Sequence, residues 1–251
     1  MCPRRKVPII YFPKPLCVGT INVDKSSLTY RRNVGQRLDV PILIWVLRSN
    51  VGGVTIVDTG AHATAFTPGA ARSQRETEKV IVALSAAGVD PNAVRTVILT
   101  HLHYDHAGNC ELFPNARLFV QRRELEYARR PLPVHRLVYQ SPALALPSER
   151  WTVVEGDTEI SPGLSVLLTP GHTPGLQAVL LETPKGHVVL ASDTVPLGEN
   201  WRGEPPDMPY VPTGAFIDLC AYDRTMRRLA STGARVVPGH DPAVLSEAWP
   251  Q

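Results

Sequence analysis

Short apolar runs separated by polar, turn-forming stretches recur along the chain, a pattern typical of a layered α/β domain. Runs of roughly four to eight apolar and β-branched residues predict buried strands. We expect strands over residues 41–48, 54–58, 94–100, 117–121, 151–155, 164–169, 178–182, 187–191 and 235–238.

Helical spacing of apolar side chains predicts helices over residues 73–87, 122–130 and 216–230. Two proline-bearing segments lack a clean period. We interpret residues 131–150 as an excursion or lid. Residues 196–212 are either one wall of a substrate pocket or a surface connection.

Length and composition then narrow the class of protein. A chain of 251 residues with 43% hydrophobic and 20% charged residues predicts one globular domain over residues 1–251. The net charge of +3 is nearly balanced. Basic residues gather over 122–136 and 224–235, where solvated helix faces explain them better than a nucleic-acid surface. We therefore expect no nucleic-acid partner.

Cysteine usage and the N-terminal residues bear on location. The four cysteines form no C-x-x-C pair, which argues against a disulfide framework and indicates a reducing compartment. Basic residues 4–6 resemble the start of a signal peptide, but Pro8, Pro13 and Pro15 interrupt the segment after them. No run approaches the roughly 20 apolar residues that span a bilayer. We expect a cytoplasmic protein without a membrane partner.

A dense group of potential metal ligands comes directly after the strand predicted over residues 94–100: His101-Leu102-His103-Tyr104-Asp105-His106. His101 and His103 are two residues apart, so an extended backbone directs both imidazoles to one side. Asp105 and His106 lie beyond the turn and can address a second metal. Core packing does not explain four such residues within six positions. The motif therefore predicts a metal site.

Three further ligand-type residues also come after predicted strands. His172 lies in Gly171-His172-Thr173-Pro174-Gly175, after the strand predicted over 164–169. Asp193 comes after 187–191, and His240 after 235–238. Strand ends and the loops after them are where a rigid scaffold presents functional side chains. We expect these residues to join the same metal site.

This pattern resembles the metallo-β-lactamase superfamily from about Ile42 to His240. The resemblance implies an α/β fold of the αβ/βα sandwich type, with two mixed β-sheets flanked by helices and the metals at one edge. It also implies that Asp193 bridges two metals and that Asp58 supports the site from outside the ligand shell. The implied ligands are His101, His103 and His172 for the first metal and Asp105, His106 and His240 for the second.

The ligand set indicates hydrolytic chemistry. Nitrogen and oxygen ligands suit two divalent ions, with zinc expected and iron, cobalt or manganese as alternatives. Such a centre activates water and polarises a carbonyl, so a metal-bridging hydroxide can attack an ester, thioester, lactone or amide. Asp105 is placed to act as the general acid/base. The expected partner is a small-molecule lactone or ester, and the expected assembly is a monomer or homodimer.

Within the superfamily the motifs are most similar to those of N-acyl homoserine lactonases, which open a lactone ring. Many of these enzymes have a substrate-binding tyrosine three residues after the bridging aspartate, where this chain has Pro196. Another donor would then have to replace it. The candidates for substrate contacts are Tyr104, Asn200, Trp201, Tyr210 and Tyr222.

The sequence leaves two other activities open. One is hydrolysis of another lactone, an ester or a thioester, as in glyoxalase II. That family usually has a helical C-terminal extension, whereas this chain ends eleven residues after His240. The other is an iron-dependent persulfide dioxygenase, which would need only His101, His172 and Asp193. A flavodiiron oxidase is disfavoured because that family has glutamate where this chain has His103.

Overall fold

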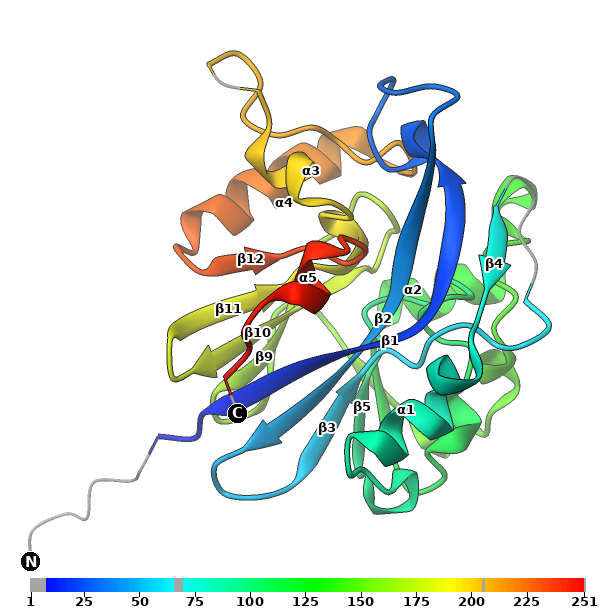
Figure 1. Ribbon diagram of the computed structural model, residues 1–251, viewed down its shortest axis with the longest axis vertical. Coiled ribbons are helices and arrows are strands. Elements are labelled where there is room, and N and C mark those ends of the chain that lie inside the picture. The colour runs from blue at the N-terminus through cyan, green and yellow to red at the C-terminus, as the bar shows by residue number, and fades with distance from the viewer. Residues whose placement is uncertain (1–7, 66–69, 205, 251) are drawn as a thin grey trace, which may run out of the picture.

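The computed structural model describes residues 8–65, 70–204 and 206–250. In this part of the chain the strands form two mixed sheets, which face each other (Figure 1). The expected sandwich of two mixed sheets is therefore confirmed. Residues 4–6, which resemble the start of a signal peptide, lie outside the described residues.

The larger sheet has seven strands in the order β4-β1-β2-β3-β5-β6-β7. Strands β1, β2, β3 and β4 are joined by antiparallel pairs, and β3, β5, β6 and β7 by parallel pairs. Their bounds are β1 Tyr11–Asp24, β2 Arg37–Ser49, β3 Val54–Val57, β4 Ala71–Ser73, β5 Thr96–Ile98, β6 Arg117–Gln121 and β7 Trp151–Val154.

The smaller sheet has five strands in the order β12-β11-β10-β9-β8. Strands β8 to β11 pair antiparallel, and β12 runs parallel to β11. Strands β9, β11 and β12 consequently point the same way and end at one edge. Their bounds are β8 Thr158–Ser161, β9 Leu164–Leu168, β10 Gln177–Thr183, β11 Gly186–Leu190 and β12 Arg235–Val237.

Helices cover the outer face of each sheet. Helices α1 and α2 lie beside the larger sheet, and α3 and α4 beside the smaller one (Figure 1). The α-helices are α1 Val80–Ala86, α2 Arg122–Arg129, α3 Gly198–Arg202, α4 Leu219–Ser231 and α5 Ala243–Ser246. Single-turn 3-10 helices occupy Lys25–Ser27, Glu76–Glu78, Pro91–Ala93, Cys110–Leu112, Pro133–His135, Pro142–Ala145, Ser148–Arg150 and Ser192–Thr194.

Strand β2 shows how one segment serves two cores. Residues 40–47 are buried without interruption. Because successive side chains of a strand point to opposite faces, Ile42 and Ile44 pack under the helices while Leu43 and Trp45 pack between the sheets. This double burial explains why β2 has a continuous apolar run in place of polar-apolar alternation.

Two features of the N-terminal third differ from the sequence prediction. The helix expected over 73–87 is confined to α1, because Ala71–Ser73 pairs with β1 and Glu76–Glu78 forms a separate 3-10 turn. Strand β1 is absent from the prediction. Its Pro13 and Pro15 pair with β2, and β4 reaches only residues 20–22, so both prolines lie where β1 is an edge strand.

The two proline-bearing segments also have local structure. Residues 131–150 form three 3-10 turns, and residues 196–212 include α3. In the described residues, no helix is long and apolar enough to cross a membrane.

Candidate metal centre

The predicted ligands converge because five strands end at one edge of the sandwich. Strands β3 and β5 of the larger sheet are parallel neighbours and lead to Asp58 and to the motif that begins at His101. Strands β9, β11 and β12 of the smaller sheet lead to His172, Asp193 and His240. Each sheet thus delivers side chains to the same edge from its own strand ends.

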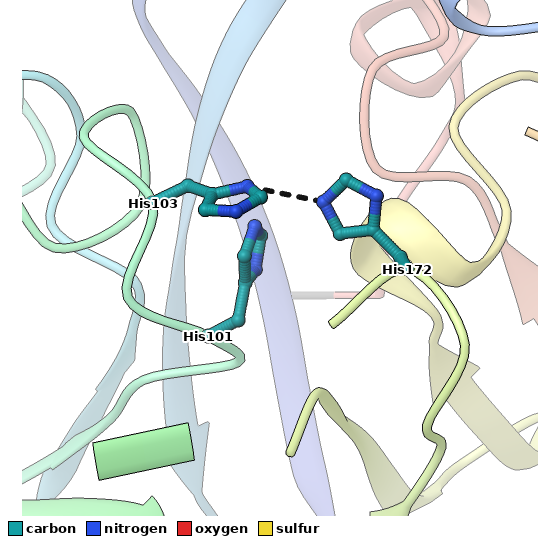
Figure 2. A group of neighbouring side chains, drawn as sticks. All are labelled: His101, His103 and His172. Atoms are coloured by element: carbon teal, nitrogen blue, oxygen red, sulfur yellow. Dashed lines mark hydrogen bonds between the residues drawn. The ribbon is translucent and has the colours of Figure 1, made fainter. Parts of the chain in front are cut away.

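The first group of candidate ligands consists of His101, His103 and His172, whose ligand atoms all lie within 4.8 Å of one another. Figure 2 shows the three imidazoles turned toward a common point, with His172 approaching from the opposite sheet. His172 Nε2 lies 3.1 Å from His103 Nδ1. Two nitrogens bound to one zinc at about 2.1 Å and the tetrahedral angle lie about 3.4 Å apart. The spacing therefore fits a shared ion.

The second group consists of Asp105, His106 and His240. Asp105 Oδ2 lies 3.7 Å from His106 Nε2 and 3.9 Å from His240 Nε2. All three side chains are almost completely buried. A carboxylate and two imidazoles at these distances form a second set of oxygen and nitrogen donors beside the first.

Asp193 lies between the two groups and presents one oxygen to each. Its Oδ2 is 3.4 Å from His172 Nε2, whereas its Oδ1 is 3.1 Å from both His106 Nε2 and His240 Nε2. A carboxylate that directs one oxygen at each ligand group can bridge two cations. The residue is 8% exposed, so water compensates little of its charge.

Hydrogen bonds on the outer side of the imidazoles fix their orientation. The Nδ1 atom of each of four histidines has a protein partner, so Nε2 faces the centre. These partners are Thr100 Oγ1 for His101 at 3.2 Å, Asp58 Oδ2 for His106 at 2.8 Å, the Ala215 carbonyl for His172 at 2.5 Å, and the Pro41 carbonyl for His240 at 2.9 Å.

The electrostatics of the centre suit a cation. Burial holds the pKa values of His101 and His103 well below the usual histidine value, which keeps both imidazoles neutral. Burial opposes protonation of His106, but the neighbouring carboxylates outweigh it and raise its pKa. Burial also opposes ionisation of Asp193, but His240 and other nearby imidazoles outweigh it and lower its pKa. Neutral imidazoles and an ionised carboxylate are the forms that bind metals, so a bound cation would displace the proton that the raised pKa favours on His106.

Two buried atoms of the centre test whether its residues fit metal ions. In the described part of the chain, the Nε2 atoms of His101 and His106 are among the few buried side-chain atoms without a hydrogen-bond partner, although His106 Nε2 lies 3.1 Å from Asp193 Oδ1 in a geometry that does not form a hydrogen bond. Such orphan atoms are costly unless something satisfies them. A cation would do so for both. The donor set and these orphan atoms together fit a metal centre.

Asp58 supports the centre from an unusual backbone conformation. Its φ is 60°, and Ser192, next to Asp193, has a φ of 49°. Left-handed non-glycine residues often occur at functional sites. Asp58 accepts hydrogen bonds from the Thr100 amide at 2.8 Å and from Thr100 Oγ1, which also lies 2.9 Å from Ser192 Oγ. These contacts connect the ends of β3, β5 and β11.

Replacing Asp58 with asparagine is expected to weaken metal binding in the second group by about 10–100-fold. Asparagine tolerates the left-handed backbone, but it cannot accept hydrogen bonds from both His106 and Thr100 with two oxygens. Competition with a chelator measures the affinity. Asp39→Asn is the matched control, because Asp39 is exposed on β2. Equal affinities in the wild type and Asp58→Asn would contradict this role.

The residues expected to contact substrate are dispersed. Asn200 is 0% exposed and bonds the Leu28 and Val211 carbonyls and the Leu197 amide. Tyr222 is also fully buried, and its hydroxyl donates to the Thr194 carbonyl. These internal bonds argue against substrate contacts for both residues.

The other three candidates also have partners within the protein. The Tyr210 hydroxyl donates to Asp223. Trp201 packs against the apolar cluster under α4. Tyr104 is 7% exposed and packs in the core that contains α1 and α2. The predicted metal ligands thus lie together at one site, whereas the residues predicted to contact substrate do not.

The sequence prediction did not include Tyr139, His135 or Glu124, of which Tyr139 contacts a candidate ligand directly. The ring of Tyr139, from segment 131–150, lies edge-on to His103 with centroids 4.7 Å apart. His135 is half-buried, and its Nδ1 lies 2.6 Å from the Tyr127 hydroxyl. Glu124 is fully buried on α2. Its helical spacing places it on the same face of α2 as Leu125 and Ala128, and this spacing could have indicated from sequence that Glu124 is buried.

The fold and the site define a class of protein. A sequence model of the metallo-beta-lactamase superfamily matches residues 37–240, and the chain belongs to that superfamily. The chain is similar to an N-acyl homoserine lactonase of Bacillus sp, with 34% identity over 89% of this chain and 90% of that protein. It is also 30% identical to the N-acyl homoserine lactonase AttM of Azorhizobium caulinodans over 92% of each chain.

A solved structure gives the same relationship. It is an N-acyl homoserine lactone hydrolase with the product N-hexanoyl-L-homoserine bound at the catalytic metal center. The TM-score is 0.75 at 26% sequence identity, and the match covers 94% of each chain. The similarity therefore extends over nearly the whole sandwich.

Proposed function

We propose that this chain is a metal-dependent hydrolase that opens lactone rings, with N-acyl homoserine lactones as the foremost substrates. The strongest support is the position of Asp193, whose two carboxylate oxygens face two different groups of histidines. It occurs in a chain that aligns with N-acyl homoserine lactonases over about nine-tenths of its length. Ring opening consumes one water and yields an N-acyl homoserine carboxylic acid.

In the proposed centre, His101, His103 and His172 would hold one divalent ion. Asp105, His106 and His240 would hold the other, and Asp193 would bind both. We propose zinc, since it suits imidazole and carboxylate ligands, with iron, cobalt and manganese as alternatives. When bound, two such ions lower the pKa of water and polarise the lactone carbonyl.

The chain's own residues then orient the reaction and move protons. We assign Asp105 as the general acid/base, which accepts a proton from the attacking water at a carboxylate oxygen and returns it to the ring oxygen as the ring opens. Asp58 holds His106 through Nδ1 and so keeps Nε2 directed inward. The buried setting of Asp105 and His106 limits competing solvent.

Comparison of three substrate classes tests the proposal. The protein, purified and loaded with zinc, is given N-hexanoyl homoserine lactone, a glutathione thioester and glutathione persulfide. We expect acid release from the lactone at a kcat/KM at least about 100-fold above that for the thioester, a difference of about 2.7 kcal/mol. Faster thioester hydrolysis would favour the glyoxalase II-like activity. Oxygen consumption with the persulfide by an iron-loaded protein would favour the dioxygenase.

The free cysteines bear on the cellular compartment in which the enzyme acts. Cys17, Cys110 and Cys220 are free, which suits a reducing compartment, and we propose a cytoplasmic location. We also propose that it acts on a small molecule, without a nucleic-acid or membrane partner, as a monomer or homodimer.

A further inference from the structure

Glu124 is a carboxylate buried in the protein interior with four hydrogen-bond donors around it. It lies on α2 and is 0% exposed. Oε1 accepts from the Leu102 amide at 3.0 Å and the Tyr139 hydroxyl at 3.1 Å. Oε2 accepts from Thr173 Oγ1 at 2.6 Å and the Gly175 amide at 3.2 Å. A buried charge is expensive unless it is satisfied in this way.

Three of the four donors belong to the segments that present the first group of ligands. Leu102 lies between His101 and His103, and Thr173 and Gly175 come shortly after His172. Glu124 therefore connects a loop of the larger sheet with a loop of the smaller sheet. Its two oxygens divide between them, one for each loop, and hold them at a fixed separation.

Tyr139 extends the contact to a ligand ring. Its hydroxyl donates to Glu124, and its aromatic ring packs edge-on against His103 with centroids 4.7 Å apart. The orientation of His103 thus depends on a residue that Glu124 itself holds. By contrast, none of the four donors belongs to a loop residue next to Asp105, His106 or His240.

Close backbone packing shows that the distance between α2 and the His172 loop is tightly fixed. A Cβ atom on Gly175 would lie 2.2 Å from the Glu124 amide nitrogen, a distance that no side chain tolerates. Glycine at this position lets the loop approach the helix closely enough for both Thr173 and Gly175 to bond Glu124. Close backbone packing and hydrogen bonds therefore both hold the His172 loop against α2.

We propose that Glu124 is a positioning residue that sets the separation of His103 and His172 and so determines the metal affinity of the first group. This inference rests on the proposed metal centre, and it does not depend on the substrate. The alternative is that Glu124 only stabilises the fold. In that case its loss would affect both metal sites alike or neither.

Cobalt titration of Glu124→Gln tests the proposal. The amide keeps the shape but replaces one acceptor oxygen with a donor group, which faces either the Leu102 and Tyr139 donors or the Thr173 and Gly175 donors. We expect cobalt affinity at one site to fall about 10–100-fold, with a changed visible absorption spectrum, while the other site stays within about twofold of wild type. Glu126→Gln, an exposed position on the same helix, is the matched control.

Thr173→Val provides a second variant if Glu124→Gln does not fold. It removes a single hydroxyl with little change in volume, and a smaller, equally selective loss of about threefold or more is expected. Two cobalt ions bound with wild-type affinities and spectra in the folded variant tested would overturn the proposal. A wild-type protein that binds fewer than two ions would instead contradict the proposed function, so the two failures are distinguishable.

Discussion

Replacing Asp193 with asparagine is expected to lower kcat/KM for lactone hydrolysis by about 1000-fold or more, a loss of about 4 kcal/mol of transition-state stabilisation. Asp193 Oδ2 faces His172 while Oδ1 faces His106 and His240. Asparagine has only one oxygen, and its amide group donates where an acceptor is needed. The bridge between the two groups would therefore be lost.

Asp90→Asn is a suitable control for this experiment. Asp90 is exposed and its side chain caps a 3-10 turn, a role that asparagine fills equally well. The control should keep wild-type activity. An Asp193→Asn variant that kept more than about a tenth of the wild-type kcat/KM, corresponding to less than about 1.4 kcal/mol, would contradict the bridging role.

Metal removal is expected to lower the melting temperature by about 10 °C or more. An ion present at about 1000 times its Kd stabilises the folded state by about 4 kcal/mol per site, and each kcal/mol shifts Tm by about 2–4 °C in a domain of this size. Without ions, the Nε2 atoms of His101 and His106 remain unsatisfied in the interior. Thermal unfolding of the chelated and zinc-reloaded proteins measures the difference.

The same comparison in Asp193→Asn provides an internal control for the thermal experiment. Because that variant lacks the bridge, its melting temperature should respond much less to zinc. Equal melting temperatures for chelated and reloaded wild-type protein would show that the centre does not bind ions tightly. They would count against both the metal assignment and the activity proposed from it.

The elements that the sequence predicts well are those with strong local signals. Strand β6 is expected over residues 117–121 and has those bounds, and the ligand motif after β5 is visible as a cluster of histidines and an aspartate. Each signal lies within a few consecutive residues. For this reason the candidate ligands can be named from sequence, although only the fold brings together residues as distant as Asp105 and His240.

Features that depend on distant partners are not predictable in the same way. The segment 73–87 has helical spacing, yet its first residue pairs with β1, so tertiary contacts override the local pattern. The substrate candidate Asn200 is polar and lies in a proline-bearing segment, but it bonds Leu28, which is distant in sequence. Glu124 lies in a highly charged helix, and only the packing of the His172 loop against that helix explains its burial.

Anomalous diffraction from crystals of the zinc-loaded protein tests the central claim most directly. We expect two peaks about 3.5–4 Å apart. One peak should lie against His101, His103 and His172, the other against Asp105, His106 and His240, with Asp193 contacting both. A single peak, or two peaks that do not share Asp193, would contradict the two-metal centre.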